Sequence, residues 1–516
     1  MKIDRIKNAS RNIVFGIVLK IYQLIVPFLM RTVIIYFMGV QYLGLNSLFT
    51  SVLQVLNLVE LGVGSAMIFS MYKPIAKDDT QMICALMKLY RTYYRIIGLV
   101  VAIIGSILIP FIPNLIAGDV PSDINVYILY ILNLSATVLS YWLFGYKNSI
   151  LNAHQRNDVI SKITLLTNTV QYIGQFLVIW ITKNYYLFVI VFLISQVLTN
   201  IITALIADRL YPNYHPKGKI EKGDVKKINR RIRDLFTSKI GNVIYESADT
   251  IVISSFLGLT TLAMYQNYFY VLTAVSGFIS VVFAACTAGI GNSIVVETKE
   301  KNYNDFTKFT FIISWIAGFC SVCLLCLYQP FMELWVGKDL MLSFSLVCCF
   351  VVYFFLKQIN SLFNLYKDAS GMWHEDRFRP LTAALTNLVL NLILVQFIGL
   401  YGILISTVLA ILCVGLPWLT HNLFTIVFEK KYIKTYLKKI TVYFFTVVIS
   451  CVITYLTVCF LDVGLIWSLI IRLVICIIIP NAIFFIFFRK TNEFKQSVLL
   501  IDNMTKGKIH FLKRFE

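Results

Sequence analysis

The chain has 516 residues, of which 58% are hydrophobic, 15% are aromatic and only 14% are charged, and its formal net charge is +20. Soluble globular domains carry roughly 25% charged residues, so this composition excludes an ordinary soluble domain and indicates a polytopic membrane protein. In a soluble protein such a positive charge would suggest nucleic-acid binding, so the placement of the cations along the chain has to decide between the two.

Apolar runs alternate with polar breaks along the whole chain. A run of about 20 apolar residues is long enough for one membrane-crossing helix. The runs predict fourteen spanning helices, which begin near residues 13, 45, 93, 124, 160, 186, 236, 262, 307, 340, 380, 402, 440 and 465. The first run is too long for the core of a signal peptide and no small-residue cleavage site follows it, so we expect it to be retained.

The cations follow the alternation of the predicted loops. If the N-terminus is cytoplasmic, 40 of the 46 Lys and Arg residues fall in cytoplasmic segments, and only Lys183 and Lys338 fall in outer loops. Cytoplasmic loops of membrane proteins carry such an excess. The positive charge is therefore a signature of membrane topology, no nucleic-acid partner is expected, and an even number of spans returns the C-terminus to the cytoplasm.

The sequence also contains an internal repeat. At an offset of 219, residues 11–44 match residues 230–263 at ten of 34 positions. The matched residues include Arg11 and Arg230, Lys20 and Lys239, and Gly39 and Gly258. Because both halves would begin in the cytoplasm, we expect a parallel repeat with its pseudo-two-fold axis along the membrane normal.

We therefore expect an all-α polytopic membrane protein with two pseudo-symmetric six-helix lobes and two C-terminal helices. The predicted parts are an N-lobe at 1–206, a basic cytoplasmic linker at 207–235, a C-lobe at 236–427, spans thirteen and fourteen at 428–488, and a basic cytoplasmic tail at 489–516. The cations of the tail suit anionic membrane lipids. The predicted outer loops are only a few residues long, so we expect no extracytoplasmic domain that could house chemistry.

Polar side chains recur on one side of several predicted spans. Lys20 and Arg31 share a face of the first span, because eleven residues bring a helix about 20° from an eclipsed position. Charges facing lipid cost several kcal/mol or more, so we expect these faces to turn inward around a water-filled cavity. The candidate cations for an anionic substrate are Arg31, Lys20, Lys357, Arg95, Lys239 and Arg472. The candidate polar lining is Gln54, Asn57, Asn168, Gln171, Asn242, Asn360 and Asn364. The candidate ion- or proton-coupling carboxylates are Glu60, Glu246 and Asp249.

Purely structural roles stay open for several of these residues. Arg95, Lys239 and Arg472 lie near a predicted membrane surface, where long side chains extend to the headgroups. Lys20 and Glu60 lie at similar predicted depth, which allows an ion pair. Asn and Gln side chains also hydrogen-bond neighbouring helices.

Two cations are hardest to explain structurally. Arg31 and Lys357 are far from both predicted membrane surfaces, and no acidic partner is evident at their depth. Arg offers paired hydrogen bonds to phosphate and Lys a point charge, so these residues indicate an anionic passenger.

The eleven cysteines lie almost entirely in apolar runs, so we expect free thiols. Cys320, Cys323 and Cys326 have helical spacing, but no His or carboxylate lies nearby to complete a metal site. We expect core packing for these residues, and neither a metal nor a cofactor.

Two stretches near the N-terminus resemble a known family. They are "RTVIIYFMGVQYLGLNSLF" at 31–49 and "ELGVGSAMIFSMYKPIA" at 60–76, and "LNAHQRND" at 151–158 adds a further likeness. The sequence resembles the polysaccharide-unit flippases of bacterial capsule and O-antigen synthesis, a branch of the multidrug/oligosaccharidyl-lipid/polysaccharide exporter superfamily. The likeness is specific over about the first 95 residues.

The resemblance implies a two-lobed bundle, usually of fourteen spans, that alternates between inward-open and outward-open states in the bacterial cytoplasmic (inner) membrane. Its substrate would be an oligosaccharide repeat unit on undecaprenyl pyrophosphate, and Lys20 and Arg31 match the cations expected to bind the pyrophosphate. The polymerase and glycosyltransferases of the same polysaccharide pathway are the protein partners implied.

Two other functions stay open. An ion-coupled drug or metabolite exporter of the same fold would suit an acidic cavity. Against it, the positive charges of Lys20, Arg31 and Lys357 balance the negative charges of the three candidate carboxylates. A membrane-embedded glycan polymerase or ligase generally needs a sizeable outer loop, which is not predicted here. No phosphate loop of the G-x-x-x-x-G-K-[ST] type is present, which disfavours a nucleotide-driven pump, and we expect no enzyme activity.

Overall fold

The computed structural model describes residues 5–118, 120–460 and 464–505, which form seventeen α-helices and no strand. The helices divide into two compact units, Met1–Ala263 (unit 1) and Met264–Glu516 (unit 2). The prediction of an all-α protein is confirmed. The finer boundaries predicted at 206, 235, 427 and 488 stay predictions, and residues 506–516 of the predicted tail lie outside the described residues.

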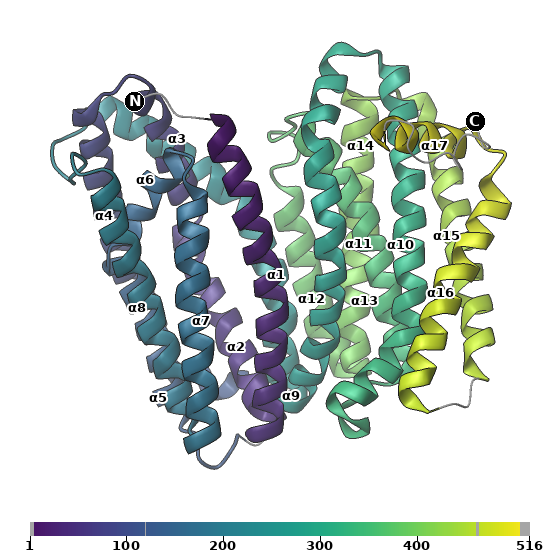
Figure 1. The fold of residues 1–516 in the computed structure, drawn as a ribbon, viewed down its shortest axis with the longest axis horizontal. Helices are drawn as coiled ribbons and strands as arrows, with labels where there is room; N and C mark the ends of the chain where they lie inside the picture. Colours follow the sequence, from purple (N-terminus) through teal and green to yellow (C-terminus); the bar gives the residue numbers. More distant parts are fainter. Residues whose placement is uncertain (1–4, 119, 461–463, 506–516) are drawn as a thin grey trace. The chain divides into compact units, whose positions relative to one another are not determined.

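Unit 1 contains eight helices and the first part of a ninth (Figure 1). Their bounds are α1 Arg5–Phe37, α2 Val40–Leu56, α3 Val63–Ala76, α4 Thr80–Leu108, α5 Val126–Trp142, α6 Asn148–Ala153, α7 Asn157–Thr182 and α8 Tyr185–Leu210. Polar residues of the connecting loops start several of these helices. The Asp79 carboxylate accepts a hydrogen bond from the N–H of Met82 (3.0 Å), and so satisfies one of the unpaired N–H groups at the start of α4.

The long helices of unit 1 pack along one another in pairs. α1 packs along α7, α7 packs along α8, and α5 packs against both α4 and α8. Large aromatic side chains fill the spaces between them, and Phe49 and Tyr130 are almost completely buried with ring centroids 6.0 Å apart. Outward-facing apolar residues such as Leu166 and Ile173 are more than half exposed. Helices that are apolar on both their inner and outer faces are typical of a membrane-embedded bundle.

α9 (Lys222–Val296) is the longest helical run and passes from unit 1 into unit 2. Its backbone leaves the helical region at Gly258, where φ is 85° and ψ is 174°. Residues with a side chain rarely adopt a positive φ, so the glycine at this position allows the break. The segment Ile116–Gly118 lies against it, since the Ala117 N–H donates to the Ser254 carbonyl (2.8 Å). The break lies where the sequence predicts the turn between spans seven and eight.

Unit 2 contains the rest of α9 and eight further helices (Figure 1). Their bounds are α10 Lys299–Val336, α11 Phe344–Ala369, α12 Arg379–Ile398, α13 Leu400–Ala410, α14 Leu416–Ile426, α15 Ile433–Cys459, α16 Leu465–Phe488 and α17 Asn492–Thr505. α10 packs against α11, α15 and α16, and α12 packs against α13. The α12–α13 turn is made by Gly399 (φ 55°), and just beyond it Gly402 lies so close to the Leu394 backbone that a Cβ would come within 2.6 Å of its carbonyl oxygen.

Many of the described helices are suited to crossing a membrane. By length and composition eleven of them could span it, and a twelfth is added if α5 and the bent segment Gly145–Ala153 form one span. The protein is thus a multi-pass membrane protein. The sequence predicts fourteen spans, two more than these twelve. One difference is α9, which contains two predicted crossings but counts as one run. The other is α7, which carries Asn and Gln residues and is not among the eleven. The count of fourteen and the cytoplasmic position of both termini stay predictions.

Each unit contains a similar buried lysine, and the two lysines are 220 residues apart, close to the offset of the sequence repeat. In unit 1, Lys147 forms an ion pair with Asp208 and its ammonium lies 5.5 Å from the ring centroid of Phe144. In unit 2, Lys367 pairs with Asp368 and lies 4.6 Å from the ring centroid of Trp373. The pairing chemistry is alike in the two units, although the spacing of the two lysines differs by one residue from the repeat offset of 219.

Candidate functional site

The two predicted cations of α1 differ in exposure. Lys20 is exposed and Arg31 is half-buried. The same helix is attached to α7 by a polar contact, because the Thr169 hydroxyl donates to the Tyr22 hydroxyl (3.0 Å). Among the residues that the structure describes, no ion pair joins Lys20 to Glu60, whose carboxylate oxygens accept hydrogen bonds from two tyrosines of unit 1.

Glu60 lies in a short 3₁₀ turn after α2 and is surrounded by tyrosine hydroxyls. Its Oε1 accepts a hydrogen bond from Tyr94 (2.6 Å) and its Oε2 accepts one from Tyr141 (2.9 Å). The Tyr90 hydroxyl donates in turn to that of Tyr94 (2.8 Å), and the Tyr141 hydroxyl also lies 2.9 Å from Oδ1 of Asn57. This network fixes the carboxylate in one orientation and offers a chain of exchangeable protons that ends on it.

The first part of α9 brings further predicted residues to the same side of unit 1. The Gln54 amide of α2 donates to the Glu246 carboxylate of α9 (3.0 Å), and the Lys239 ammonium lies 3.4 Å from the Ser65 hydroxyl of α3. Asn242, one turn from Glu246, is exposed. These contacts join α2, α3 and α9 into one polar surface that carries both signs of charge. We define the unit 1 polar face as Gln54, Asn57, Glu60, Lys239, Asn242 and Glu246.

Unit 2 presents a different cation environment on α11. The half-buried Lys357 ammonium lies 5.5 Å from the ring centroid of Phe269 and 5.6 Å from that of Tyr353. Aromatic faces attract a cation but leave its three N–H donors available. The next residue, Gln358, donates to the Ser276 hydroxyl (2.9 Å) and joins α11 to the second part of α9. Lys357 is thus held in position and still able to bind an anion.

The two amides on the same helix are in different surroundings. The Asn364 side-chain oxygen accepts a hydrogen bond from Arg379 (2.8 Å), which is also paired with Asp376 (2.6 Å). The Asn360 side-chain oxygen is buried and, within the described part of the chain, has no hydrogen-bond partner. A buried unpaired carbonyl is costly, so Asn360 is the better prepared of the two to accept a hydrogen bond from a ligand hydroxyl.

Other predicted residues of unit 1 are in different surroundings. On α7, Gln171 is buried and bonds Gln175, which in turn donates to the Phe188 carbonyl of α8 (3.3 Å). This is the interhelical role that the sequence left open. Asn168 on the same helix is half-buried, and Arg95 on α4 is exposed.

The last two predicted residues lie on α9 and α16. Asp249 is half-buried in the first part of α9, one turn from Glu246. Arg472 is in unit 2, in a pocket formed by α10, α11, α15 and α16.

Sequence reasoning missed the three tyrosines around Glu60. Tyr90 and Tyr94 are four residues apart, which places them on one face of α4, and this spacing was the available signal. Tyr141 had no such signal, because it comes from α5 and its bond to Glu60 joins residues 81 positions apart.

The stretch "LNAHQRND" forms a buried charge cluster at the start of α7. Asp158 is completely buried and pairs with Arg156 (3.0 Å), Lys162 (3.7 Å) and Arg11 of α1 (3.8 Å). Burial raises the pKa of Asp158, but the hydrogen bond from Arg156 and the three positive charges outweigh this, and the net pKa lies below its usual value. The cluster attaches the beginning of α1 to the beginning of α7 and is a structural feature.

Comparison with known proteins identifies the family. Residues 9–288 match the family described as Polysaccharide biosynthesis protein. No curated protein matched the sequence.

Solved structures show the same fold. The lipid II flippase MurJ, in an inward closed conformation, is similar with a TM-score of 0.69 and 18% identity over 92% of this chain and 99% of that chain. An inward-facing multidrug resistance MATE family transporter of the MOP superfamily has a TM-score of 0.61 and 15% identity over 77% of this chain and 93% of that chain. A MATE transporter from Vibrio cholerae has a TM-score of 0.51 and 13% identity, and 81% of this chain and 98% of that chain are covered.

These identities are low, so the structural matches show the fold, and the family match covers more than half of the sequence. The chain belongs to the Polysaccharide biosynthesis protein family and has the fold of the MOP superfamily.

Proposed function

We propose that this protein is a flippase that moves undecaprenyl-pyrophosphate-linked oligosaccharide repeat units from the cytoplasmic to the outer leaflet of the bacterial cytoplasmic membrane. It would act by alternating access, as a transporter and not as an enzyme, in the synthesis of a surface polysaccharide such as a capsule or O-antigen. One observation carries the proposal: a polysaccharide-biosynthesis family match is combined with a fold that a lipid II flippase shares over 92% of this chain.

The side chains of each unit suit the two ends of such a headgroup. In unit 1, Lys20 and Arg31 would supply positive charge for a pyrophosphate, and in unit 2 Lys357 would do so, because the two rings beside it leave its N–H donors available. The amides of Asn57, Asn242 and Asn360 suit sugar hydroxyls, because an amide can both donate and accept hydrogen bonds.

A second candidate is an ion-coupled exporter of drugs or metabolites. It is favoured by the likeness to MATE family transporters and by Glu60, whose carboxylate ends a chain of hydroxyl groups. Protonation of this carboxylate would convert it from an acceptor into a donor and rearrange the tyrosines around it. The same step would serve a proton-coupled flippase, so the identity of the substrate separates the two functions.

The test is deletion of the gene in its host, followed by mass spectrometry of the undecaprenyl-linked pool and an assay of surface polysaccharide. A flippase predicts accumulation of complete repeat units on the cytoplasmic side and loss of the surface glycan. An unchanged pool with altered sensitivity to toxic compounds would instead support the exporter.

Complementation with variants then tests the residues. Arg31→Gln and Lys357→Gln should reach the membrane at normal levels but restore less than about a tenth of the surface glycan, since each removes a charge-assisted contact to phosphate. Lys226→Gln is the matched control, because Lys226 is exposed near the start of α9 and should restore the glycan fully. Full activity of both Arg31→Gln and Lys357→Gln would exclude these cations from the substrate site.

A further inference from the structure

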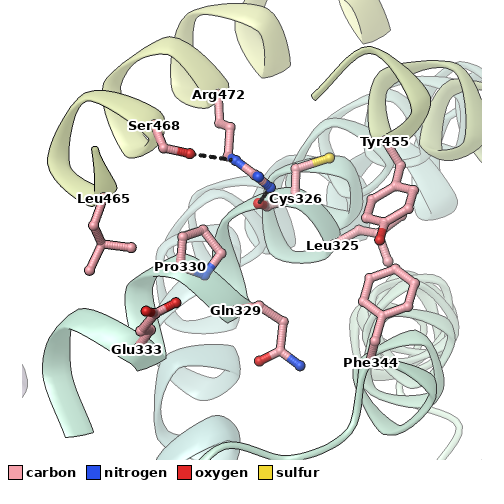
Figure 2. A pocket seen from close by; sticks show the side chains of 10 residues that line it. All are labelled: Leu325, Cys326, Gln329, Pro330, Glu333, Phe344, Tyr455, Leu465, Ser468 and Arg472. Atoms are coloured by element: carbon pink, nitrogen blue, oxygen red, sulfur yellow. Dashed lines mark hydrogen bonds between the residues drawn. The ribbon is translucent and has the colours of Figure 1, made fainter. Parts of the chain in front are cut away.

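A pocket of about 410 Å³ lies at the end of unit 2 that is opposite to α17. It is lined by the last turns of α10 and α15 and by the first turns of α11 and α16 (Figure 2). Under the predicted topology these helix ends face the outer leaflet. The pocket belongs to unit 2 alone and contains neither Lys357 nor any residue of the unit 1 polar face.

Arg472 of α16 provides the positive charge of this pocket. Its Nε donates to the Ser468 hydroxyl (2.9 Å) and one Nη1 hydrogen is donated to the Cys326 carbonyl of α10 (3.3 Å). Figure 2 shows the guanidinium lying between α16 and α10 at the edge of the pocket. A guanidinium has five N–H donors, so these two contacts fix its orientation and leave three for a ligand.

The described lining of the pocket has one cation and one carboxylate, Arg472 and Glu333, and of these two it is Arg472 that has no ion-pair partner. Glu333 is the acidic residue in its lining, and this carboxylate pairs with Lys338 (3.4 Å). Among the residues that the structure describes, no carboxylate forms an ion pair with Arg472. A cation in a membrane-spanning helix is costly unless something neutralises it, and a ligand with one negative charge would do so.

Under the predicted topology, the pocket would lie near the headgroups of the outer leaflet. Arg472 is seven residues beyond the first residue of α16, which is roughly 10 Å along a helix axis. Beside it on the first turns of α16, Trp467 is 67% exposed and Ile466 is 62% exposed. Tryptophan is enriched where membrane helices pass through the headgroup region, so this part of α16 faces lipid near the membrane surface.

One side of the pocket is aromatic. The rings of Phe344 (α11) and Tyr455 (α15) are stacked with centroids 4.6 Å apart and an interplanar angle of 23°. This pair provides an apolar surface opposite the guanidinium (Figure 2). Within the described part of unit 2, the pocket therefore combines an arginine that has no ion pair with an apolar surface, as expected for a group that is charged at one end and attached to a lipid at the other.

We propose that this pocket binds the phosphodiester headgroup of a singly charged anionic phospholipid from the outer leaflet, with Arg472 bonding two phosphate oxygens. The single positive charge of Arg472 fits one phosphodiester, whereas a pyrophosphate carries more negative charge than one arginine balances. The site is separate from the proposed transport site, and the inference does not depend on what the protein transports.

The experiment is native mass spectrometry of the full-length protein purified from vesicles that contain equal amounts of phosphatidylglycerol and phosphatidylcholine. Wild-type protein should retain phosphatidylglycerol in preference to phosphatidylcholine. Arg472→Gln should retain about tenfold less phosphatidylglycerol, because it removes the charge-assisted contacts to the phosphate. Lys183→Gln is the matched control, since it removes another cation of the predicted outer side from unit 1 and should leave retention unchanged.

A second variant keeps the test informative if Arg472→Gln does not fold. Glu333→Gln makes the pocket more positive and should retain more phosphatidylglycerol than the wild type. Equal retention by the wild type, Arg472→Gln and Glu333→Gln would overturn the proposal. Displacement of phosphatidylglycerol from the wild type by an equal concentration of undecaprenyl pyrophosphate, or by inorganic phosphate, would also overturn it, because the preferred ligand would then not be a phospholipid.

Discussion

The buried charge cluster at the start of α7 yields the sharpest prediction. Asp158→Asn keeps the size of the side chain and removes the negative charge that three cations share. Loss of one partner from a buried ion pair typically costs roughly 3–5 kcal/mol. The side chains of Arg156, Arg11 and Lys162 remain 23%, 35% and 48% exposed, so water can partly solvate the cations after the change. We therefore expect a loss of about 2–3 kcal/mol in the free energy of unfolding of unit 1.

The assay is thermal unfolding of the purified protein in detergent, read by size-exclusion chromatography of the soluble fraction. For a unit of this size, each kcal/mol corresponds to roughly 2–4 °C, so Asp158→Asn should lower the Tm by about 5–10 °C. Asp224→Asn is the control, because it removes an exposed ion pair with Lys227 (2.8 Å), which should contribute less than about 1 kcal/mol. If Asp158→Asn and Asp224→Asn shift the Tm equally, the buried cluster does not stabilise the fold as argued.

Three further predictions follow from particular contacts. The contribution of Asp158 to the stability of unit 1 should be constant between pH 5.5 and 8 and be lost in acid, because its pKa is lowered from 3.8 and the contribution disappears as the pH falls through the folded-state pKa. The difference in unfolding midpoint between the wild type and Asp158→Asn, measured against pH, would show this. Gly402→Ala should lower the free energy of unfolding by roughly 1–3 kcal/mol through overpacking, since the new Cβ would come within 2.6 Å of the Leu394 carbonyl oxygen, and an unchanged Tm would contradict this close approach. Tyr94→Phe should change the pH dependence of export and leave the amount of protein in the membrane unchanged, because it removes a hydrogen bond to Glu60, and an identical pH profile would count against a coupling role for this carboxylate.

The helices could be predicted from sequence because their signals are local. Runs of apolar residues define the spans, and Asp79 and Gly258 are recognisable as a helix start and a helix break from their residue types alone. The side-chain partners were not predictable in the same way. Glu60 is bound by tyrosines that follow it by 34 and 81 residues, and such contacts depend on how the helices pack and not on spacing within one helix.

The candidate site shows the same limit. The polar face of α7 could be identified by its spacing, but only the packing of α8 shows that Gln171 is buried in an interhelical contact. Lys357 was predicted as a deep cation, whereas its contact with the ring of Phe269 depends on the second part of α9. Arg472 bonds a carbonyl 146 residues earlier in the chain, so the pocket around it had no counterpart in the sequence pattern.

The extent of unit 1 has a consequence for biosynthesis. Unit 1 ends at Ala263 and includes the first part of α9, although residues 230–263 are the second copy of the repeat that begins at residue 11. The ribosome must therefore have begun the second copy of the repeat before the first unit is complete. Synthesis proceeds at about 5–20 residues per second. Several seconds would therefore pass between the completion of α8 and that of the first part of α9, whose Glu246 accepts the hydrogen bond from Gln54. During that interval the nascent unit exposes polar side chains of α2 and α3 without their partners, and it is then a natural client for membrane insertion factors.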